Sequence, residues 1–185
     1  MRTLKFKHAF SYPFNRAKGL WNILWILLPI FGWLALSGYS IRIVKEFSKG
    51  KFKKLPLFKF SSDLELGFFM FFKGLPFMIA YFVIVEIFGF VFPWFGSLTD
   101  IFLGVFIVPI LTVNFYNKET VSSYFEFKVL KSVFYNIGDY ITVILKSILL
   151  VIVFALMIIV LIGFPAMAFT DNMFLADFYR RRVRA

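Results

Sequence analysis

Long runs of apolar residues constrain this chain more than any other feature. Residues 20–41 carry no charged side chain, and residues 141–162 carry only Lys146. Residues 67–117 are also mostly apolar and contain three charged residues. Since a helix of about 20 residues crosses the hydrocarbon core of a bilayer, each run is long enough to enter a membrane. The chain is 61% hydrophobic, above the roughly half typical of soluble domains, so the sequence predicts an integral membrane protein.

Proline and glycine interrupt each apolar run and predict reversals of the chain. The turn signals are Pro29 to Gly32, Pro93 to Gly96 and Gly163 to Pro165. The predicted fold is all-α, a polytopic integral membrane helical bundle of three helical hairpins, the first re-entrant, with interfacial amphipathic segments. The arms are expected at residues 18–28 and 33–47, 67–92 and 97–116, and 139–162 and 166–179.

The chain is predicted to form a single membrane domain over residues 1–185, because no polar or Gly/Ser-rich linker divides it. Six consecutive parts are expected. They are a basic interfacial segment (1–18), the first hairpin (19–47), a basic cytoplasmic loop (48–66), the second hairpin (67–116), an amphipathic cytoplasmic segment (117–138), and the third hairpin with a basic tail (139–180).

The positions of Lys and Arg predict the orientation. Five precede residues 20–41 and seven follow before the next apolar run. Because Lys and Arg beside membrane segments favour the cytoplasm, a first segment that folds back would keep both groups inside. We therefore expect a multi-pass protein of the cell membrane with both termini cytoplasmic. The sequence leaves two alternatives open: residues 20–41 cross once, as the first of four simple spans, or they are a signal peptide cleaved near Ala35 to Ser37.

Residues that perform catalysis are scarce. The chain has no Cys, and His8 is its only histidine, which argues against zinc sites and Cys-His or Ser-His-Asp catalysis. No phosphate-binding loop occurs, because Lys49-Gly50-Lys51 lacks the required spacing. We predict a protein that is not an enzyme, with no catalytic, cofactor-binding or metal-ligating residues and no cofactor. The net charge of +11 is spread between apolar runs, so nucleic acid is not an expected partner.

Three acids within the predicted hairpin arms are the candidates for a cation or proton site. Glu86, Asp100 and Asp171 each lie a few residues from a predicted outer turn. Charged groups are costly in hydrocarbon and often mark a function. If the hairpins pack together, the three carboxylates could share one layer. Alternatively, each carboxylate faces the outer headgroups separately.

Basic residues after the first apolar run are the candidates for a surface that binds lipid or a partner. They are Arg42, Lys45, Lys49, Lys51, Lys53 and Lys54. Each Lys or Arg near an anionic membrane contributes about 1 kcal/mol. The expected partners are the bilayer, its anionic headgroups, and a second copy or another membrane protein. The alternative function is a small permease or transporter subunit that uses the intramembrane acids, and an enzyme acting on lipid ranks third.

Short motifs along nearly the whole chain resemble one known family. They include Gly38-Tyr39 with Arg42 three residues on, and Asn136 followed by Gly138-Asp139-Tyr140. Others are Tyr12-Pro13-Phe14, Pro29, Leu55-Pro56, Asp63, Gly67, Pro76 and Tyr179-Arg180. In this order they resemble a prokaryotic family of membrane proteins catalogued as domain of unknown function number four thousand and thirteen. The resemblance implies a membrane protein but no reaction, substrate or catalytic residue. The last arm is shorter than the family pattern, which puts a full final crossing in doubt.

Overall fold

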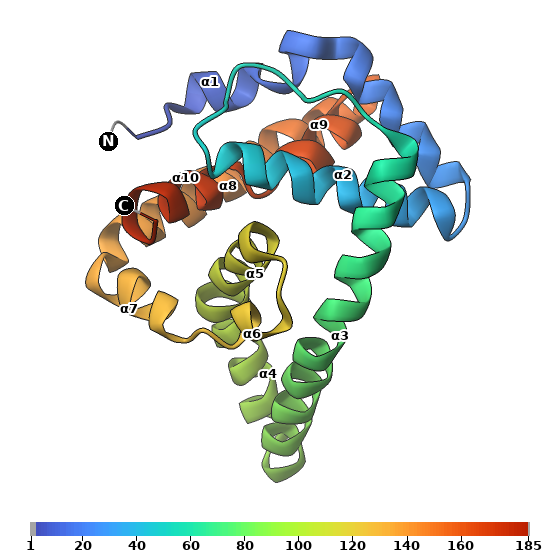
Figure 1. Cartoon of the computed structure of the whole chain (residues 1–185). Helices are drawn as coiled ribbons and strands as arrows, with labels where there is room; N and C mark the ends of the chain where they lie inside the picture. The colour runs from blue at the N-terminus through green and yellow to red at the C-terminus, as the bar shows by residue number, and fades with distance from the viewer. Residues whose placement is uncertain (1–2, 185) are drawn as a thin grey trace.

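The computed structural model describes residues 3–184, and within that range every regular element is a helix (Figure 1). The elements are α1 (Phe6–Ser11), η1 (Pro13–Leu27), α2 (Phe31–Phe47), α3 (Phe60–Val91), α4 (Pro93–Phe102), η2 (Leu103–Ile107), α5 (Val108–Lys118), α6 (Val121–Tyr124), α7 (Lys128–Tyr135), α8 (Ile137–Leu156), η3 (Met157–Val160), α9 (Gly163–Thr170) and α10 (Met173–Arg182). The all-α prediction is therefore confirmed for the described residues.

The first apolar run reverses direction between η1 and α2. Ile30 has φ 63° and ψ −68°, and the Phe31 N–H donates to the Pro29 carbonyl at 2.7 Å. These values define a classic γ-turn, which is rare and strained. On the far side of the turn, the Trp33 indole N–H donates to the Ile26 carbonyl at 2.8 Å. Residues 20–41 therefore form two helices joined by a turn rather than one continuous helix, which supports the reversal predicted at Pro29 to Gly32.

Helices α2 and α3 cross at two glycines with almost no space between their backbones. A Cβ atom on Gly38 would lie 1.8 Å from the Asp63 carbonyl oxygen, and one on Gly67 would lie 1.9 Å from the Leu34 carbonyl oxygen. Any side chain at either position would have to separate the two helices, because those partners are backbone atoms. Small residues allow the same close approach between membrane helices.

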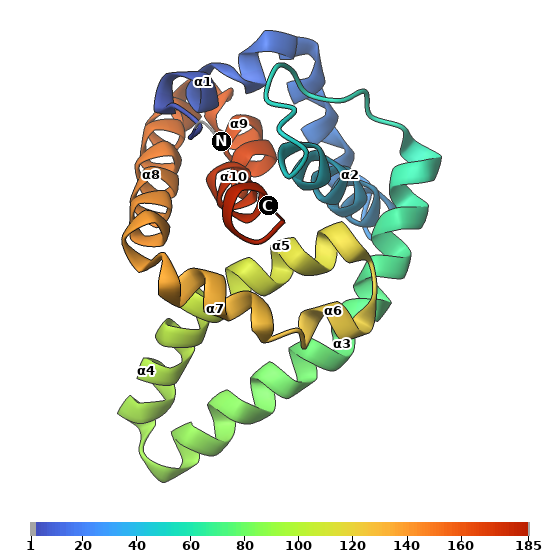
Figure 2. The same cartoon turned by 60° about the vertical axis from the view of Figure 1, so that its left-hand side comes forward.

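Helices α3 and α4 form a long hairpin that projects from the rest of the protein (Figures 1 and 2). The connection is Phe92, which is extended, with φ −149° and ψ 123°. The turn thus lies just before the predicted Pro93 to Gly96, since proline is well suited to the first turn of a helix. Gly96 lies inside α4 and packs on α3, where its added Cβ would be 2.6 Å from the Gly89 Cα.

Helix α3 begins at Phe60, seven residues before the predicted Gly67.

Proline affects the two middle helices differently. Pro76 lies inside α3, which continues without interruption. Pro109 follows a π-helical turn, Leu103–Ile107, and cannot donate a hydrogen bond to the carbonyl of Val105, four residues earlier. The Tyr140 hydroxyl on α8 donates to that carbonyl instead, at 3.0 Å. A neighbouring helix thus satisfies the backbone group that proline leaves unpaired.

This substitute hydrogen bond leads to a prediction. Tyr140 is fully buried, so Tyr140→Phe should leave the Val105 carbonyl unpaired and lower the free energy of unfolding by about 1–3 kcal/mol. Thermal unfolding of the purified protein in detergent measures the loss. In a Pro109→Ala background the new N–H can bond to Val105, so Tyr140→Phe should then cost clearly less. An equal cost in both backgrounds would contradict the assignment.

The predicted amphipathic segment, residues 117–138, contains the short helices α6 and α7. Val129 and Val133 of α7 are buried, whereas Lys128 and Lys131 are exposed. Lys118 forms an ion pair with Glu126, and a hydrogen bond from this lysine holds the pKa of the Glu126 carboxyl below its usual value. Helix α7 buries Val129 and Val133, but its outer side carries the exposed Phe134 and Tyr135 beside the two lysines.

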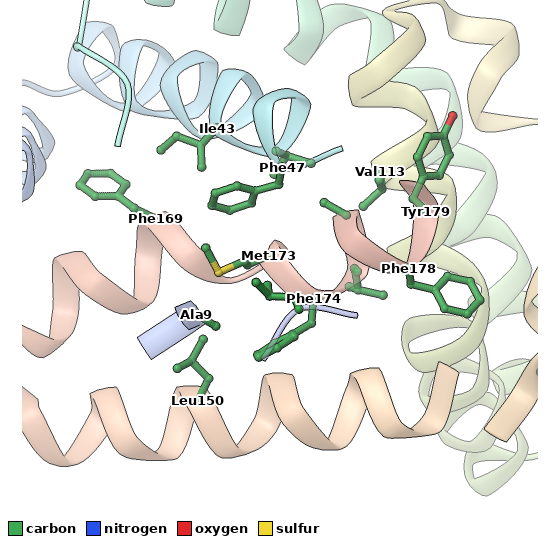
Figure 3. Packing of buried hydrophobic residues seen from close by; sticks show 14 of the residues in the cluster. Ala9, Ile43, Phe47, Val113, Leu150, Phe169, Met173, Phe174, Phe178 and Tyr179 are labelled. Carbon is green, nitrogen blue, oxygen red and sulfur yellow. The ribbon is translucent and has the colours of Figure 1, made fainter. Parts of the chain in front are cut away.

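Helix α10 lies in the middle of the core, between α2, α5 and α8 (Figure 2). All residues from Met173 to Tyr179 are buried. Figure 3 shows Met173 and Phe174 between Phe47 of α2 and Leu150 of α8, with Ala9 of α1 close by. The end of the chain, predicted as a third-hairpin arm with a basic tail, is thus a central packing element.

The long helices present large apolar side chains outward. Phe90 is 93% exposed and Ile159 is 88% exposed, and soluble proteins rarely leave broad apolar surfaces in water. Among residues 3–184, three segments are long and apolar enough to cross a membrane: Phe60–Phe90, Trp94–Lys118 and Ile137–Ile159. These segments support a multi-pass membrane protein.

Candidate anion-binding surface

The loop between α2 and α3, residues 48–59, has a backbone fixed by polar side chains on other elements. Arg16 donates to the Leu55 carbonyl. The Tyr39 hydroxyl donates to the Pro56 carbonyl at 2.9 Å, and Arg42 donates to the Leu57 carbonyl at 2.7 Å. Hydrogen bonds from η1 and α2 therefore hold three successive carbonyls of a segment that has no regular secondary structure.

A buried ion pair closes the end of this loop. Arg42 Nε and Nη2 donate to Asp63 Oδ1 and Oδ2 at 2.8 and 2.7 Å, the two-pronged geometry of the strongest carboxylate pairs. Asp63 is 0% exposed and also accepts the Lys59 N–H at 2.7 Å. It lies in the first turn of α3, where a negative charge is favoured by the helix dipole. The pair fixes where the loop meets α3.

The six residues predicted to form the lipid or partner surface fall into two groups. Arg42 and Lys45 lie on α2 and pair with Asp63 and Glu119, so their charges are matched by carboxylates within the fold. Lys49, Lys51, Lys53 and Lys54 lie beyond the end of α2 and are exposed. These four, the loop lysines, form no ion pair within residues 3–184.

Two cavities are lined by three of the loop lysines, Lys51, Lys53 and Lys54. The first, of about 600 Å³, is lined by Arg16, Arg42, Glu46, Gly50, Lys51, Lys53, Lys54, Leu55, Pro56, Leu57 and Lys59. The second, of about 530 Å³, is lined by Thr3, Leu4, Lys5, His8, Ser11, Asn15, Gly50, Phe52, Lys53 and Arg180. Arg16, Lys59, Lys5, His8 and Arg180 thus belong to the surface although the sequence analysis did not include them. The alternation of basic and aromatic residues near the N-terminus was the available signal.

The structure does not bring the three candidate acids together. Asp100 on α4 accepts a hydrogen bond from Tyr81 on α3. Glu86 is exposed on α3. Asp171 lies between α9 and α10, where it accepts a bond from Asn172 at 3.1 Å. Residues 3–184 contain no group of three or more His, Asp or Glu side chains arranged to hold a metal. The three-acid layer is therefore wrong, because the last arm folds into the core beside α8 and away from the α3–α4 hairpin (Figure 1).

The arginines at the end of α10 are anchored to two acids. Arg181 donates to Asp177 at 2.9 Å and to Asp139 of α8 at 2.7 Å. Arg182 also contacts Asp139, at 3.0 Å, and the Leu4 N–H donates to Asp177 at 3.1 Å. This network connects both ends of the described chain to α8, so these arginines stabilise the fold.

The motif residues also occupy structural positions. Gly38 and Gly67 form the close crossing of α2 with α3. Arg42 pairs with Asp63, and Tyr140 satisfies the carbonyl that Pro109 leaves unpaired. Residues far apart in the sequence therefore support each other, which explains why the motifs occur together in one chain.

Comparison with known proteins agrees with the resemblance seen in the motifs. Residues 22–163 match a family described as "Protein of unknown function (DUF4013)". No curated protein and no solved structure matches the chain. Since the matched region covers most of the 185 residues, the chain belongs to the DUF4013 family.

Proposed function

We propose that this protein is a non-enzymatic, multi-pass membrane protein that binds anionic lipid headgroups. The binding surface is the α2–α3 loop with its four loop lysines, and the hairpin of η1 and α2 inserts as a wedge into one leaflet. The observation that carries the proposal is the set of unpaired, exposed lysines on a backbone held in place by Arg16, Tyr39 and Arg42.

The fixed backbone favours binding because the loop loses little conformational entropy when the ligand binds. An unpaired lysine also has no competing carboxylate to release. Each basic residue near an anionic surface contributes about 1 kcal/mol, so four such residues supply a substantial attraction at moderate salt. Dissolved ions screen these charges, so the attraction weakens as the salt concentration rises.

The tip of the first hairpin supports the wedge. Its large apolar side chains are exposed, including Leu27 at 76% and Phe31 at 57%. Ile30 and Trp33 are also exposed. Tryptophan is enriched where a protein meets the membrane interface, and an exposed apolar tip gains free energy when lipid replaces water.

The same geometry supports cytoplasmic termini. The chain reverses at Ile30, so the basic residues before η1 and those after α2 belong to the two ends of one hairpin. Both groups then lie on one side of the bilayer, which the distribution of Lys and Arg favours for the cytoplasm. The loop lysines would face the inner leaflet, where anionic lipids create a negative surface potential.

The experiment compares two double substitutions of equal charge. Lys51→Gln/Lys54→Gln removes two loop lysines, and Lys128→Gln/Lys131→Gln removes two exposed lysines from α7. The protein is extracted with its surrounding lipid from membranes containing about one-fifth phosphatidylglycerol, and the anionic fraction is measured. We expect enrichment for wild type and for the α7 variant. For the loop variant, the loss of roughly 1 kcal/mol for each of two lysines should weaken binding by about thirtyfold and abolish most of the enrichment. Equal enrichment in all three proteins would refute the proposed function.

A small permease remains the alternative prediction. Its strongest sequence argument was a layer of three intramembrane acids, and these acids lie apart in the fold. The feature that still favours transport is the break in the middle helices, the π-helical turn Leu103–Ile107 before Pro109.

A further inference from the structure

Resting on the proposed function, we infer that the surface binds one lipid with two phosphodiester groups, one phosphate in each of the two cavities beside the α2–α3 loop. A lipid of this class carries two phosphates joined by a short glycerol bridge. The inference depends on the charge of each cavity, on their adjacency and on their position at the start of a candidate span.

The first cavity is strongly basic. Six of its lining side chains are cationic, and five of them form no salt bridge within the described chain: Arg16, Lys51, Lys53, Lys54 and Lys59. Arg42 also lines it, but pairs with Asp63. Glu46 is the single acid in the lining. The volume of about 600 Å³ accommodates a phosphodiester with its ester carbons, and the excess of cations selects an anion.

The second cavity is also basic and has more neutral hydrogen-bonding groups. Lys5, His8 and Lys53 line it, and none of its lining residues is acidic. Arg180 also lines it, but pairs with Asp177 at 2.6 Å. The Asn15 amide, which donates one N–H to the Lys53 carbonyl, has a second N–H that can donate to a phosphate oxygen. This cavity, of about 530 Å³, can therefore hold a second phosphate.

The two cavities are neighbours because they share Gly50 and Lys53. The Asn15 side chain donates to the Lys53 carbonyl at 2.7 Å, so the backbone that separates the cavities is fixed. Gly50 has φ 78°, a conformation that favours glycine, and it brings the chain through a tight turn between the two sites. A ligand with two phosphates a few bonds apart can thus reach both cavities at once.

A lipid is the expected source of the two phosphates, rather than a free ligand. Lys59 immediately precedes α3, the first candidate span. Leu57, which lines the first cavity, is 66% exposed and offers an apolar contact beside the cations. Charged groups next to an exposed apolar side chain at the start of a span match the boundary between headgroup and acyl chain.

Two linked phosphates should bind more tightly than two separate ones. Once the first phosphate occupies one cavity, the second is present at a high effective concentration. We therefore expect a two-phosphate lipid to bind at least about tenfold more tightly than phosphatidylglycerol compared at equal phosphate concentration. The full-length protein in neutral detergent is titrated with short-chain cardiolipin, short-chain phosphatidylglycerol and inorganic phosphate, and binding is measured by native mass spectrometry.

Single substitutions locate the sites. Lys51 lines only the first cavity and Lys5 only the second, so Lys51→Gln and Lys5→Gln should each remove most of the preference for two phosphates while leaving phosphatidylglycerol bound. Lys53→Gln affects both cavities and should weaken both lipids. All three lysines are exposed, so thermal unfolding without lipid should not change. Lys131→Gln on α7 is the matched control and should keep the preference.

The outcomes separate this inference from the proposed function. Equal affinity for the two lipids at equal phosphate would overturn the two-phosphate site and leave general anionic-lipid binding intact. Inorganic phosphate that competes as strongly as the lipid would show a free-phosphate site and overturn the lipid assignment. No binding of any anionic lipid would overturn both.

Discussion

Gly38→Leu should prevent the protein from folding, and Gly38→Ala should lower the free energy of unfolding by about 3 kcal/mol or more, at or above the upper end for overpacked sites. The first added atom on Gly38 would lie 1.8 Å from the Asp63 carbonyl oxygen and 2.7 Å from the Gly67 nitrogen. Both are backbone atoms, which cannot rotate away as a side chain can. The helices must separate, and this would strain the neighbouring Arg42–Asp63 pair.

Gly104→Ala is the matched control, because no atom lies within 4 Å of an added Cβ there. It should be neutral or slightly stabilising, since alanine is favoured over glycine in helices by up to about 1 kcal/mol. Thermal unfolding in detergent and the yield of monodisperse protein measure both variants. A Gly38→Ala protein as stable as Gly104→Ala would show that α2 and α3 do not cross as described.

The sequence predicted the apolar segments well, because the length of each apolar run can be counted directly from the residues. Turn residues such as Pro29 and Gly163 also placed the chain reversals to within a few residues. The start of α3 was predicted seven residues late, at Gly67 instead of Phe60. The first turn of α3 contains Asp63. A charged residue at this position favours the prediction of a loop, because the sequence does not show that Asp63 pairs with Arg42.

The candidate surface was predicted only in part for a similar physical reason. Charge patterning identifies a basic loop but does not show which cations have partners. Arg42 and Lys45 were included because they are near the loop in sequence, whereas their carboxylates come from α3 and from the end of α5. Arg180 was excluded because its position, beside Gly50, depends on the last helix folding into the core.

For the three acids, the sequence suggested a common site that the structure does not contain. Glu86, Asp100 and Asp171 share a spacing from predicted turns, and this spacing suggested a common layer. A common layer also requires the hairpins to pack side by side, which sequence spacing does not determine. In the structure α9 and α10 pack on α8 and α2 instead, and Asp171 stays with them.

Arg42→Met should destabilise the protein by about 3–5 kcal/mol, the range expected when one member of a buried ion pair is removed. Asp63 is 0% exposed, and its remaining partner would be the Lys59 N–H. Asp63→Asn should cost less, because the Arg42 side chain is 25% exposed and water can reach it. The same measurement of thermal unfolding applies, with Lys45→Met as the control, since the Lys45–Glu119 pair is 28% and 34% exposed and should contribute no more than about 1 kcal/mol.

The double variant Arg42→Met/Asp63→Leu separates the ion pair from simple loss of contacts. Replacing both charges with apolar groups removes the uncompensated carboxylate, and buried pairs replaced in this way are often neutral or more stable. We therefore expect the double variant to be more stable than Arg42→Met alone. It should still lose the hydrogen bond from Arg42 to the Leu57 carbonyl, so its loop lysines should be less well held and its enrichment of anionic lipid reduced. A double variant that is less stable than Arg42→Met alone would contradict this assignment. Asp63 would then be stable without the arginine, which requires contact with water. The pair would therefore not be the buried contact that fixes the loop to α3.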